Sequence, residues 1–593
     1  MTTQVLDKER FYYSFMAGAK AVIKRKNHLN EINVFPVADG DTGSNLASLM
    51  QTILTKSNLD EDNSKTFKSI TDAALIGARG NSGIIFASYL SGWLNALSDK
   101  DTIALEDFAA AIEAAVPYAY EAIENPVEGT MITLMKDFAE AFKTQKNTSN
   151  NFNTILEETL KTLNVSLENT KVTMQKLRNS DVVDAGAKGF IHFIEGFTLY
   201  MTTGEETAVD LDDAPSLDST EHLDFGAETY RYCTEALIKG ENISQKQLKD
   251  TVKSLGDSVV VAGNNRILRL HIHTDQPQEV FYHLRSYGSI IEQKVDDMKK
   301  QHEIVHNRKF KTALVTDSIA DLPKTYIDEK QIHVIPISLI IEDSNYYDKL
   351  TISSDKFYQF MDSLSTYPKS AQPNQKQVEN FYSFLSSYYE NIVVLSVSEK
   401  MSGTYNVFKQ AAKVLENTKT NIRVINTMQN SGAEGLLVMK AQEWIEAGKS
   451  IDEIEAGLLD LRHKTKILVS VKTLKYMVRS GRLKKAVGIV GKAVNLKPVI
   501  SIDDTGEGII FDKAFSLNKA TQKIKAHIDT IAKEKGIERF AIVHANAIDR
   551  ANQYAKTFEA MLNMKPSYII DISTVVAMNA GIGTVAIAYI EKT

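Results

Sequence analysis

Two aspartates, Asp39 and Asp41, stand two residues apart in a glycine-broken loop that runs from Asn33 to Asn45 (Asn-Val-Phe-Pro-Val-Ala-Asp-Gly-Asp-Thr-Gly-Ser-Asn). Carboxylate oxygens on a bent backbone suit Mg²⁺, which takes one or two carboxylates and completes its octahedron with water and substrate phosphates. We expect a helix to begin near Ser44, so that its free N–H groups and its positive dipole end face the same space. Taken alone, the spacing also fits a solvated turn.

Three further glycine-bearing loops interrupt the same part of the chain, at residues 77–83, 126–131 and 181–189. The first of them, Gly-Ala-Arg-Gly-Asn-Ser-Gly, offers backbone N–H groups and the Ser82 hydroxyl to an anion at the start of a long helix. Each loop by itself could be a plain connection between two helices. Four such loops exceed what chain reversal requires, and together they indicate phosphate binding.

A second group of candidate metal ligands includes two histidines on the predicted strand Ile267–Thr274. Strand alternation places His271 and His273 on one face, roughly 6 to 7 Å apart at Cα. With the single cysteine, Cys233, they supply three ligands appropriate to Zn²⁺. The alternative is a pair of surface histidines and a buried thiol. No fourth ligand can be named, and a structural or docking role is favoured over catalysis because the phosphate loops lie in another predicted domain.

Hydroxyl-bearing turns characterise the C-terminal half. The segment Val315–Pro323 ends a first strand and opens a helix, as expected at the carboxyl edge of an α/β sheet. Ser370 follows in the turn 369–374, and Ser402 in the turn 398–405. These hydroxyls and nearby backbone N–H groups could bind a carboxylate. Taken separately, each turn favours an N-cap or a simple reversal.

The elements that must position these residues change character along the chain. Residues 9–203 contain amphipathic segments such as Ile84–Leu97 and predict an α-helical bundle or barrel. The acidic stretch 205–224 predicts a linker. Short strands then alternate with helices, first in a small α/β region and from Thr312 in a larger one. The predicted domains are 1–204, the linker 205–224, 225–310 and 311–593.

Length and composition exclude several classes of protein. At 593 residues, with 43% apolar and 24% charged residues and a net charge of −7, the chain should form several globular domains and should not bind nucleic acid. No run approaches the roughly 18 apolar residues of a membrane span, and apolar stretches such as His333–Ile341 predict strands. Residues 1–27 lack the pattern of a signal peptide. We therefore expect a cytoplasmic protein without a transmembrane segment.

The four loops, in this order and spacing, resemble the nucleotide-binding domain of dihydroxyacetone kinases (the DhaL or DAK2 type), and more closely its version in the ATP-binding subunit of bacterial fatty acid kinase. The resemblance covers about residues 8–200 and implies an antiparallel helical barrel whose acidic rim holds ATP and two Mg²⁺ ions. It implies Asp39 and Asp41 as catalytic metal carboxylates, beside Asn33, where dihydroxyacetone kinases have a third aspartate. The residues it places at the phosphates are Thr42, Ser44, Asn45, Asn81, Ser82 and Gly83. Those it places near the nucleoside are Thr130, Met131, Asp184 and Gly186.

Two further resemblances cover the rest of the chain. The motifs Tyr-Cys-Thr-Glu at 232–235 and His-Ile-His-Thr at 271–274 are similar to the middle domain of fatty acid kinase. This resemblance favours a zinc site at Cys233, His271 and His273 over two surface histidines and a buried thiol. Residues 311–591, including the motifs at 479–482 and 579–584, resemble the DegV family. Proteins of this family have two α/β lobes and bury a fatty acid. By this resemblance Ser370 and Ser402 bind the carboxylate, and Arg482 binds the phosphoryl group during transfer.

Three departures from these families bear on function. Where the DegV family usually has Thr-Ser-Gln-Pro-Ser, this chain has Ser-Ala-Gln-Pro-Asn at 370–374. Where it commonly has histidine in the final loop, this chain has Asn579, which can donate a hydrogen bond to the acyl site but cannot carry a proton. The two subunits are normally separate chains, and fusion raises the effective concentration of one for the other.

Together these resemblances imply an ATP-dependent phosphotransferase that converts a bound long-chain fatty acid to acyl phosphate, with Mg²⁺ and Zn²⁺ as cofactors. We expect a homodimer that contacts membranes transiently during acyl exchange. Two alternatives stay open: a lipid carrier or sensor that accepts no phosphate, and a kinase of a small polyol such as dihydroxyacetone. The polyol alternative fares worse because the separate acceptor-binding subunit of those kinases has no counterpart in the sequence.

Overall fold

The computed structural model describes residues 4–33, 40–173, 177, 180–205, 230–416, 419–481 and 496–592. Asp39, Arg482 and all but the first residue of the predicted linker 205–224 lie outside these ranges. The chain divides into two compact units. The first comprises Met1–Gln276 and His283–Asp297, and the second comprises Pro277–Tyr282 and Met298–Thr593.

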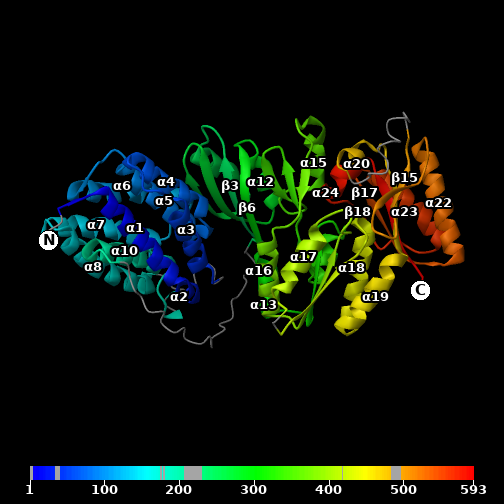
Figure 1. Ribbon diagram of the computed structural model, residues 1–593, viewed down its shortest axis with the longest axis horizontal. Coiled ribbons are helices and arrows are strands. Elements are labelled where there is room, and N and C mark those ends of the chain that lie inside the picture. The colour runs from blue at the N-terminus through cyan, green and yellow to red at the C-terminus, as the bar shows by residue number, and fades with distance from the viewer. Residues whose placement is uncertain are drawn as a thin grey trace. The chain divides into compact units, whose positions relative to one another are not determined.

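The first unit begins with a bundle of helices, drawn in blue and cyan in Figure 1. The helices are α1 (Lys8–Lys24), α2 (Lys26–Glu31), α3 (Thr42–Lys56), α4 (Asn63–Gly77), α5 (Gly80–Ala96), α6 (Leu105–Ala122), α7 (Met131–Lys146), α8 (Phe152–Thr173) and α10 (Ala185–Thr203). A short antiparallel ladder joins β1 (Val5–Leu6) to β2 (Ile103–Ala104). The fully buried Trp93 meets Phe11 and Phe108 edge to face, at centroid distances of 6.0 and 5.4 Å. The predicted all-α N-terminal domain is confirmed.

A four-stranded antiparallel sheet completes the first unit. Its strands are β3 (Tyr232–Lys239), β4 (Asp257–Gly263), β5 (Ile267–Thr274) and β6 (Ser289–Asp297), in the order β4-β5-β3-β6, with α11 (Gln245–Val252) and α12 (Pro277–Leu284) between them in the chain. Cys233 lies opposite His273, and Glu235 opposite His271. Because side chains directly opposite one another share a face, these four side chains point to the same side of the sheet. Val260 and Ala262 of β4 join the apolar core of the helices.

The second unit has two lobes. The first contains a parallel sheet of order β13-β12-β7-β8 and a small antiparallel sheet of order β10-β9-β11. Its strands are β7 (Thr312–Asp317), β8 (His333–Ile335), β9 (Ser338–Ile341), β10 (Ser344–Tyr347), β11 (Lys369–Ala371), β12 (Asn391–Ser396) and β13 (Asn421–Asn426). Its helices are α13 (Met298–His306), α14 (Lys324–Glu329), α15 (Ser354–Phe360), α16 (Gln375–Ser386) and α17 (Thr404–Lys413), with a 3₁₀ turn at Met361–Ser363.

The second lobe is built on a six-stranded mixed sheet of order β16-β15-β14-β19-β17-β18. Its strands are β14 (Thr465–Ser470), β15 (Val499–Ile502), β16 (Gly508–Asp512), β17 (Ile537–His544), β18 (Ile569–Asp571) and β19 (Val585–Glu591). The helices of this part of the chain are α18 (Ser431–Glu446), α19 (Ile451–Lys464), α20 (Lys475–Arg479), α22 (Leu517–Glu534), α23 (Ile548–Leu562) and α24 (Thr574–Ala580). The predicted two-lobed α/β fold is confirmed.

Two local predictions in the second unit are wrong. The apolar stretch His333–Ile341, predicted as one strand, forms β8 and β9 in different sheets, with Pro336 between them. Proline cannot donate to a strand ladder, so the run breaks there. The predicted turn 369–374 contains β11, which pairs with β9. Asn374 closes it by capping α16, accepting hydrogen bonds from Lys376 N and Gln377 N.

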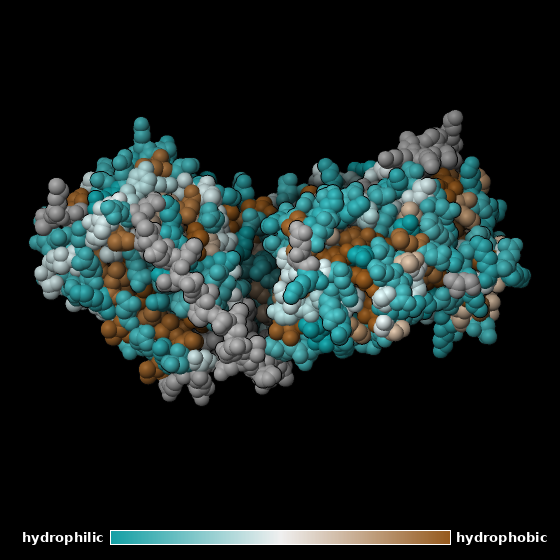
Figure 2. All heavy atoms as spheres, turned by 60° about the horizontal axis from the view of Figure 1, so that its bottom comes forward, coloured by the Kyte–Doolittle hydropathy of each residue, from teal (hydrophilic) through white to brown (hydrophobic). Residues whose placement is uncertain are grey.

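Among the described residues, no helix is both long enough and apolar enough to cross a membrane. On the face drawn in Figure 2, hydrophilic side chains cover most of the surface, and apolar side chains reach it in smaller patches.

Candidate functional site

The start of α3 is held by two asparagines, Asn30 and Asn33, that precede it in the chain. Thr42 Oγ1 donates to Asn33 Oδ1 at 2.9 Å. Asn30 accepts from Ser44 N and donates to Ser44 Oγ, each at 3.0 Å. Asn30 therefore caps the helix, a role that sequence reasoning missed because nothing in a 14-residue separation signals the contact. The predicted phosphate ligand Ser44 is thus already tied to α2 through both its amide and its hydroxyl.

The four predicted loops converge in the first unit. Gly80 has φ +57°, and a Cβ there would lie 2.3 Å from Asn45 Nδ2, so the starts of α3 and α5 are in contact. A Cβ at Gly186 would lie 3.0 Å from Met131 Cε and 3.4 Å from Ser82 Oγ, which brings in the starts of α7 and α10. Four helix N-termini therefore lie together. Their N–H groups and dipoles create a positive potential suited to phosphate groups.

Two buried polar groups at this point, Asp184 and Asn81, differ in how they are satisfied. Asp184 caps α10 by accepting from Ala187 N at 2.7 Å, and Met131 N also donates to it. Burial nevertheless raises the pKa of Asp184 to about 6. Asn81 Oδ1 is buried and has no hydrogen-bond partner within the described part of the chain. A buried acceptor of this kind is costly unless a ligand or water satisfies it, which fits a binding role for Asn81.

The remaining predicted nucleotide residues lie on the same helix ends. Gly83 is in the first turn of α5, and its N–H donates to Arg79 O at 3.1 Å. Thr130 directly precedes α7, and its hydroxyl donates to Val127 O at 2.8 Å. The candidate ligands for Mg²⁺ are the Asp41 carboxylate, the Asn33 amide oxygen and the Thr42 hydroxyl. All three are hard oxygen atoms, which this ion prefers. Asp39, the second predicted carboxylate, lies outside the described residues.

Cys233, His271 and His273 form a cluster suited to a metal ion. Their ligand atoms all lie within 4.8 Å of one another. The Cys233 Sγ to His271 Nδ1 distance is 3.8 Å, near the ~3.6 Å that tetrahedral Zn²⁺ bonds would set. Both histidines are buried, so the alternative of two surface histidines is wrong. The structure thus brings the three predicted ligands together, with a donor set that fits zinc.

The protonation states of these ligands follow from their surroundings. Burial, and then the neighbouring His271, lower the pKa of His273 to about 3, so its imidazole is neutral and has a lone pair to donate. Desolvation, followed by the Asp296, Glu235 and Asp41 carboxylates, raises the pKa of the Cys233 thiol well above its ordinary value. The thiol therefore keeps its proton until a cation displaces it.

The metal-ligand cluster lies beside the phosphate loop of α5. Arg269 Nε donates to Ala78 O at 2.9 Å, and Arg79 forms a 2.9 Å ion pair with Glu292. Gly80 N donates to Glu235 Oε1 at 2.5 Å. The loops and the cluster, which were predicted to lie in different domains, are therefore in contact, so this prediction gives no reason to favour a structural or docking role for the metal. Glu235 was not singled out from the sequence, although strand alternation places it on the same face as Cys233.

The second unit contains a cavity of about 310 Å³ lined by residues of both lobes. The three predicted acyl-site residues that the structure describes, Ser370, Ser402 and Asn579, all line it. Further polar lining comes from Gln372, Asn430, Ser431, Ser501 and Thr584. The apolar lining includes Ile319, Ile337, Val397, Met401, Ile467, Val469, Met477, Ile500, Ile502, Val543, Ile572 and Val575. A largely apolar cavity with a few polar groups suits an amphipathic ligand.

The polar groups of this cavity differ in how they are held. Ser402 Oγ lies 2.8 Å from Thr404 Oγ1, at the start of α17. A Cβ at Gly403 would lie 2.0 Å from Gln372 Oε1, so the Gln372 side chain packs directly against the backbone of Gly403. Asn579 Nδ2 donates to Val575 O at 2.6 Å, whereas its Oδ1 is buried without a hydrogen-bond partner in the described residues.

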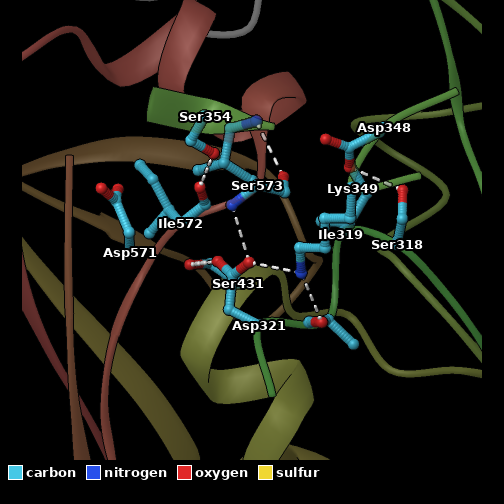
Figure 3. A network of polar contacts seen from close by, with 12 residues as sticks. Ser318, Ile319, Asp321, Asp348, Lys349, Ser354, Ser431, Asp571, Ile572 and Ser573 are labelled. Carbon is cyan, nitrogen blue, oxygen red and sulfur yellow. Dashed lines mark hydrogen bonds and ion pairs between the residues drawn. The ribbon is translucent and has the colours of Figure 1, made fainter. Parts of the chain in front are cut away.

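A buried aspartate holds the start of α24, the helix that carries Asn579. Figure 3 shows Asp321 of the first lobe between Ser431 and Ser573. Its carboxylate accepts from Ser431 Oγ at 2.5 Å, Ser573 N at 2.8 Å and Lys349 Nζ at 2.8 Å. Both the cavity wall and the first turn of α24 are thus tied to one carboxylate.

A second aspartate, Asp348, acts in the same way on the next residue of α24. Its carboxylate accepts from Thr574 N at 2.8 Å and from Ser318 Oγ at 2.7 Å. Burial raises the pKa of Asp348 to about 6. No sequence pattern signals the contacts of the two aspartates with α24, because they join residues more than 200 positions apart.

Three family models match consecutive parts of the chain. Residues 36–199 match the DAK2 domain, and residues 229–305 match the FakA-like middle domain of fatty acid kinase. Residues 311–592 match the family described as uncharacterised protein, DegV family.

Curated relatives and solved structures are similar to parts of the chain. An uncharacterized protein of Staphylococcus saprophyticus is 32% identical over 313 residues, which are 51% of this chain and 56% of the relative. Protein YloV of Bacillus subtilis is 30% identical over 332 residues, which are 53% and 59%. The chain therefore spans less than two thirds of the length of either relative.

Among solved structures, DegV of Bacillus subtilis, described as a fatty acid binding protein, is 24% identical with a TM-score of 0.45, over 48% of this chain and 100% of that one. A stearic acid-binding protein of Eubacterium ventriosum is 25% identical with a TM-score of 0.44, over 48% and 98%. The resemblance drawn from the sequence motifs is confirmed by the family models: the chain joins a DAK2 domain, a FakA-like middle domain of fatty acid kinase and a DegV-family domain in one polypeptide.

Proposed function

We propose that this chain is an ATP- and Mg²⁺-dependent kinase that phosphorylates the carboxylate of a bound long-chain fatty acid. The observation that carries the proposal is the pairing, on one chain, of four converging helix N-termini beside Asp41 with an apolar cavity that exposes Ser370, Ser402 and Asn579. The DAK2 and DegV matches support this assignment of the two units.

In this proposal the first unit holds the nucleotide. The helix N-termini bind its phosphates, and Asp41, Asn33 and Thr42 supply oxygen ligands to the metal. Mg²⁺, when bound, neutralises charge on the phosphates during transfer. We propose further that Cys233, His271 and His273 hold Zn²⁺.

The cavity of the second unit holds the acceptor. Ser370 and Ser402 donate hydrogen bonds that orient the carboxylate, while the apolar lining binds the acyl chain. A carboxylate oxygen attacks the γ-phosphorus, the bond from the γ-phosphorus to the bridging oxygen breaks, and ADP leaves. Because the attacking carboxylate carries no proton, the site needs no general base, and an asparagine at position 579 is compatible with turnover.

The test is ADP release by the full-length chain with Mg²⁺-ATP, with and without oleate. We expect release to depend on oleate and to fall at least about 100-fold in Asp41→Asn, because a metal carboxylate is lost. Ser402→Ala should weaken oleate binding by about tenfold and leave nucleotide binding unchanged. Asp452→Asn, an exposed change on α19, is the control. Equal ADP release with and without oleate would contradict the proposal.

A second candidate is a lipid carrier or sensor that accepts no phosphate. Asn579 favours it, because its Nδ2 is already engaged with Val575 O and its neutral amide, unlike a protonated histidine, has no positive charge to stabilise a phosphate. For a carrier, lipid co-purifies with the chain, the wild type shows no oleate-dependent ADP release, and Asn579→His creates it. For the kinase, the wild type already turns over. Because lipid co-purifies in either case, the ADP-release assay on the wild type and on Asn579→His separates the two.

A further inference from the structure

Glu235 lies between the metal-ligand cluster and the phosphate loop of α5. Its Oε1 accepts from Gly80 N at 2.5 Å and lies 3.4 Å from His271 Nδ1. The Glu235 side chain is only 2% exposed, and its Oε2 has no hydrogen-bond partner among the residues that the structure describes. One buried carboxylate therefore touches both a metal ligand and the loop.

The start of α5 depends on this carboxylate. Arg79 occupies the N-cap position, and its side chain makes no capping hydrogen bond. The first N–H groups of a helix have no partner within the helix, so acceptors must come from elsewhere. Glu235 supplies one from β3, and a negative charge at a helix N-terminus is favourable. The first turn of α5, which carries Asn81 and Ser82, is positioned by this contact.

The β4-β5-β3-β6 sheet makes two further contacts with the phosphate loop of α5, and neither involves a metal ligand. Arg269 Nε donates to the carbonyl oxygen of Ala78, and Arg79 pairs with Glu292. These contacts attach the loop to β5 and β6. Of these three contacts between the sheet and the loop, the one made by Glu235 also involves a metal ligand, His271. Substitution of Glu235 can therefore be distinguished from substitution of a residue that holds the loop alone.

We infer that Glu235 is a positioning residue that makes metal binding at Cys233, His271 and His273 and nucleotide binding at the phosphate loops depend on each other. The inference rests on the proposed nucleotide site. His271 Nδ1 lies 3.8 Å from Cys233 Sγ and 3.4 Å from Glu235 Oε1, so a metal bound to this nitrogen would lie beside the Glu235 carboxylate. The cation would attract the carboxylate, and the carboxylate in turn fixes Gly80 N. Such coupling is reciprocal, so nucleotide must tighten metal binding by the same factor.

The experiment measures Mg²⁺-ADP binding to the full-length chain by calorimetry, before and after a zinc-selective chelator acts in excess Mg²⁺. In the wild type, zinc removal weakens Mg²⁺-ADP binding by about tenfold. Glu235→Ala keeps about one zinc per chain by elemental analysis, binds Mg²⁺-ADP about tenfold more weakly than the wild type, and does not respond to zinc removal. Glu235→Gln retains an acceptor for Gly80 N and restores most of the affinity.

Glu292→Gln is the matched control, because it removes the ion pairs of Glu292 with Arg79 and Arg269 and leaves Glu235 in place. It keeps the tenfold response. In the reciprocal measurement, saturating Mg²⁺-ADP tightens zinc binding in the wild type and not in Glu235→Ala. Circular dichroism checks folding, and the response of the wild type to zinc removal carries the test if the alanine variant misfolds.

The inference is overturned if Glu235→Ala keeps the wild-type response, if nucleotide binding by the wild type ignores zinc, or if the chain takes up no zinc. A wild-type chain that binds zinc but no nucleotide in either state overturns the proposed function instead. The two failures are therefore distinguishable.

Discussion

Glu434 on α18 is fully buried, and neither of its carboxylate oxygens has a hydrogen-bond partner in the part of the chain that the structure describes. Burial, and then the nearby Asp317 and Asp321, raise the pKa of Glu434 well above its ordinary value. Burial likewise raises the pKa of Asp317 to about 6. Protonated Glu434 is the form that this site stabilises, because an ionised carboxylate there would lack both water and a partner.

This raised pKa predicts a pH-dependent effect of Glu434→Gln. The unfolded chain loses the Glu434 proton near pH 4.5 while the native state keeps it, so the native state binds more protons above that pH. The free energy of unfolding of the wild type therefore falls as pH rises, by up to about 1.4 kcal/mol per pH unit from this group, until the pH reaches the raised pKa. Glutamine has no such proton to lose.

We expect the stability advantage of Glu434→Gln over the wild type to grow from about pH 5 to about pH 7, as measured by urea denaturation of the full-length chain. Glu534→Gln, an exposed change on α22, is the control and should show no such trend. An advantage that stays constant with pH would contradict the raised pKa of Glu434.

Several of the predicted site residues lie together in the structure, and their signals in the sequence are local. Ser402 and Asn579 lie in short sequence motifs next to helix ends. The alternation of residues along β5 predicted that His271 and His273 share a face of the sheet. Asn30 and Asp321 were missed because their contacts depend on how distant elements pack. Periodicity states which face of an element is buried but does not name the surface that covers it.

At the scale of elements, α24 is a short helix whose position is fixed from the other lobe. Asp321 and Asp348 accept hydrogen bonds from the backbone N–H groups at its start. The same helix supplies Val575, Val576 and Asn579 to the cavity. A change in the aspartates should therefore reach the acyl site without altering any residue that touches the acyl chain.

We predict that Asp321→Asn lowers the free energy of unfolding by about 3 kcal/mol, because it breaks a buried charged contact with Lys349 and weakens the contacts with Ser431 and Ser573. It should also weaken binding of a fluorescent fatty acid. Urea denaturation and fluorescence titration measure the two effects. Asp452→Asn is the control, since it removes an ion pair with Arg423 in which Asp452 is 77% exposed, worth less than about 1 kcal/mol. Unchanged lipid affinity in Asp321→Asn would show that α24 does not depend on this anchor.

Secondary structure was predicted more accurately than the contacts between helices and strands that are distant in the sequence. The alternating β5 and the amphipathic α5 lie close to the predicted ranges. The run His333–Ile341 failed because one proline divides it between two sheets. The metal cluster was predicted with its ligands, yet its proximity to Gly80 was not, because that contact joins residues 155 positions apart.

At the scale of the molecule, five apolar clusters formed by described residues each lie within one of the two units. The largest cluster of the first unit extends from Leu6 to Ala262. The clusters of the second unit draw on residues from Ile304 to Ile590. Because each of these clusters uses residues of one unit alone, each unit has apolar burial of its own to support cooperative unfolding.

We therefore predict two unfolding transitions in calorimetry of the full-length chain. A ligand that binds only the native state stabilises the unit that holds its site, by about 2.7 kcal/mol at a free concentration of about 100 times its Kd. Mg²⁺-ADP should raise the midpoint of one transition, and oleate that of the other. Asp41→Asn should abolish the first shift and keep the second, and Ser402→Ala should reduce only the second. A single transition that both ligands raise together would mean that the two units unfold as one, and the assignment of one ligand to each unit would then need direct binding measurements on these two variants.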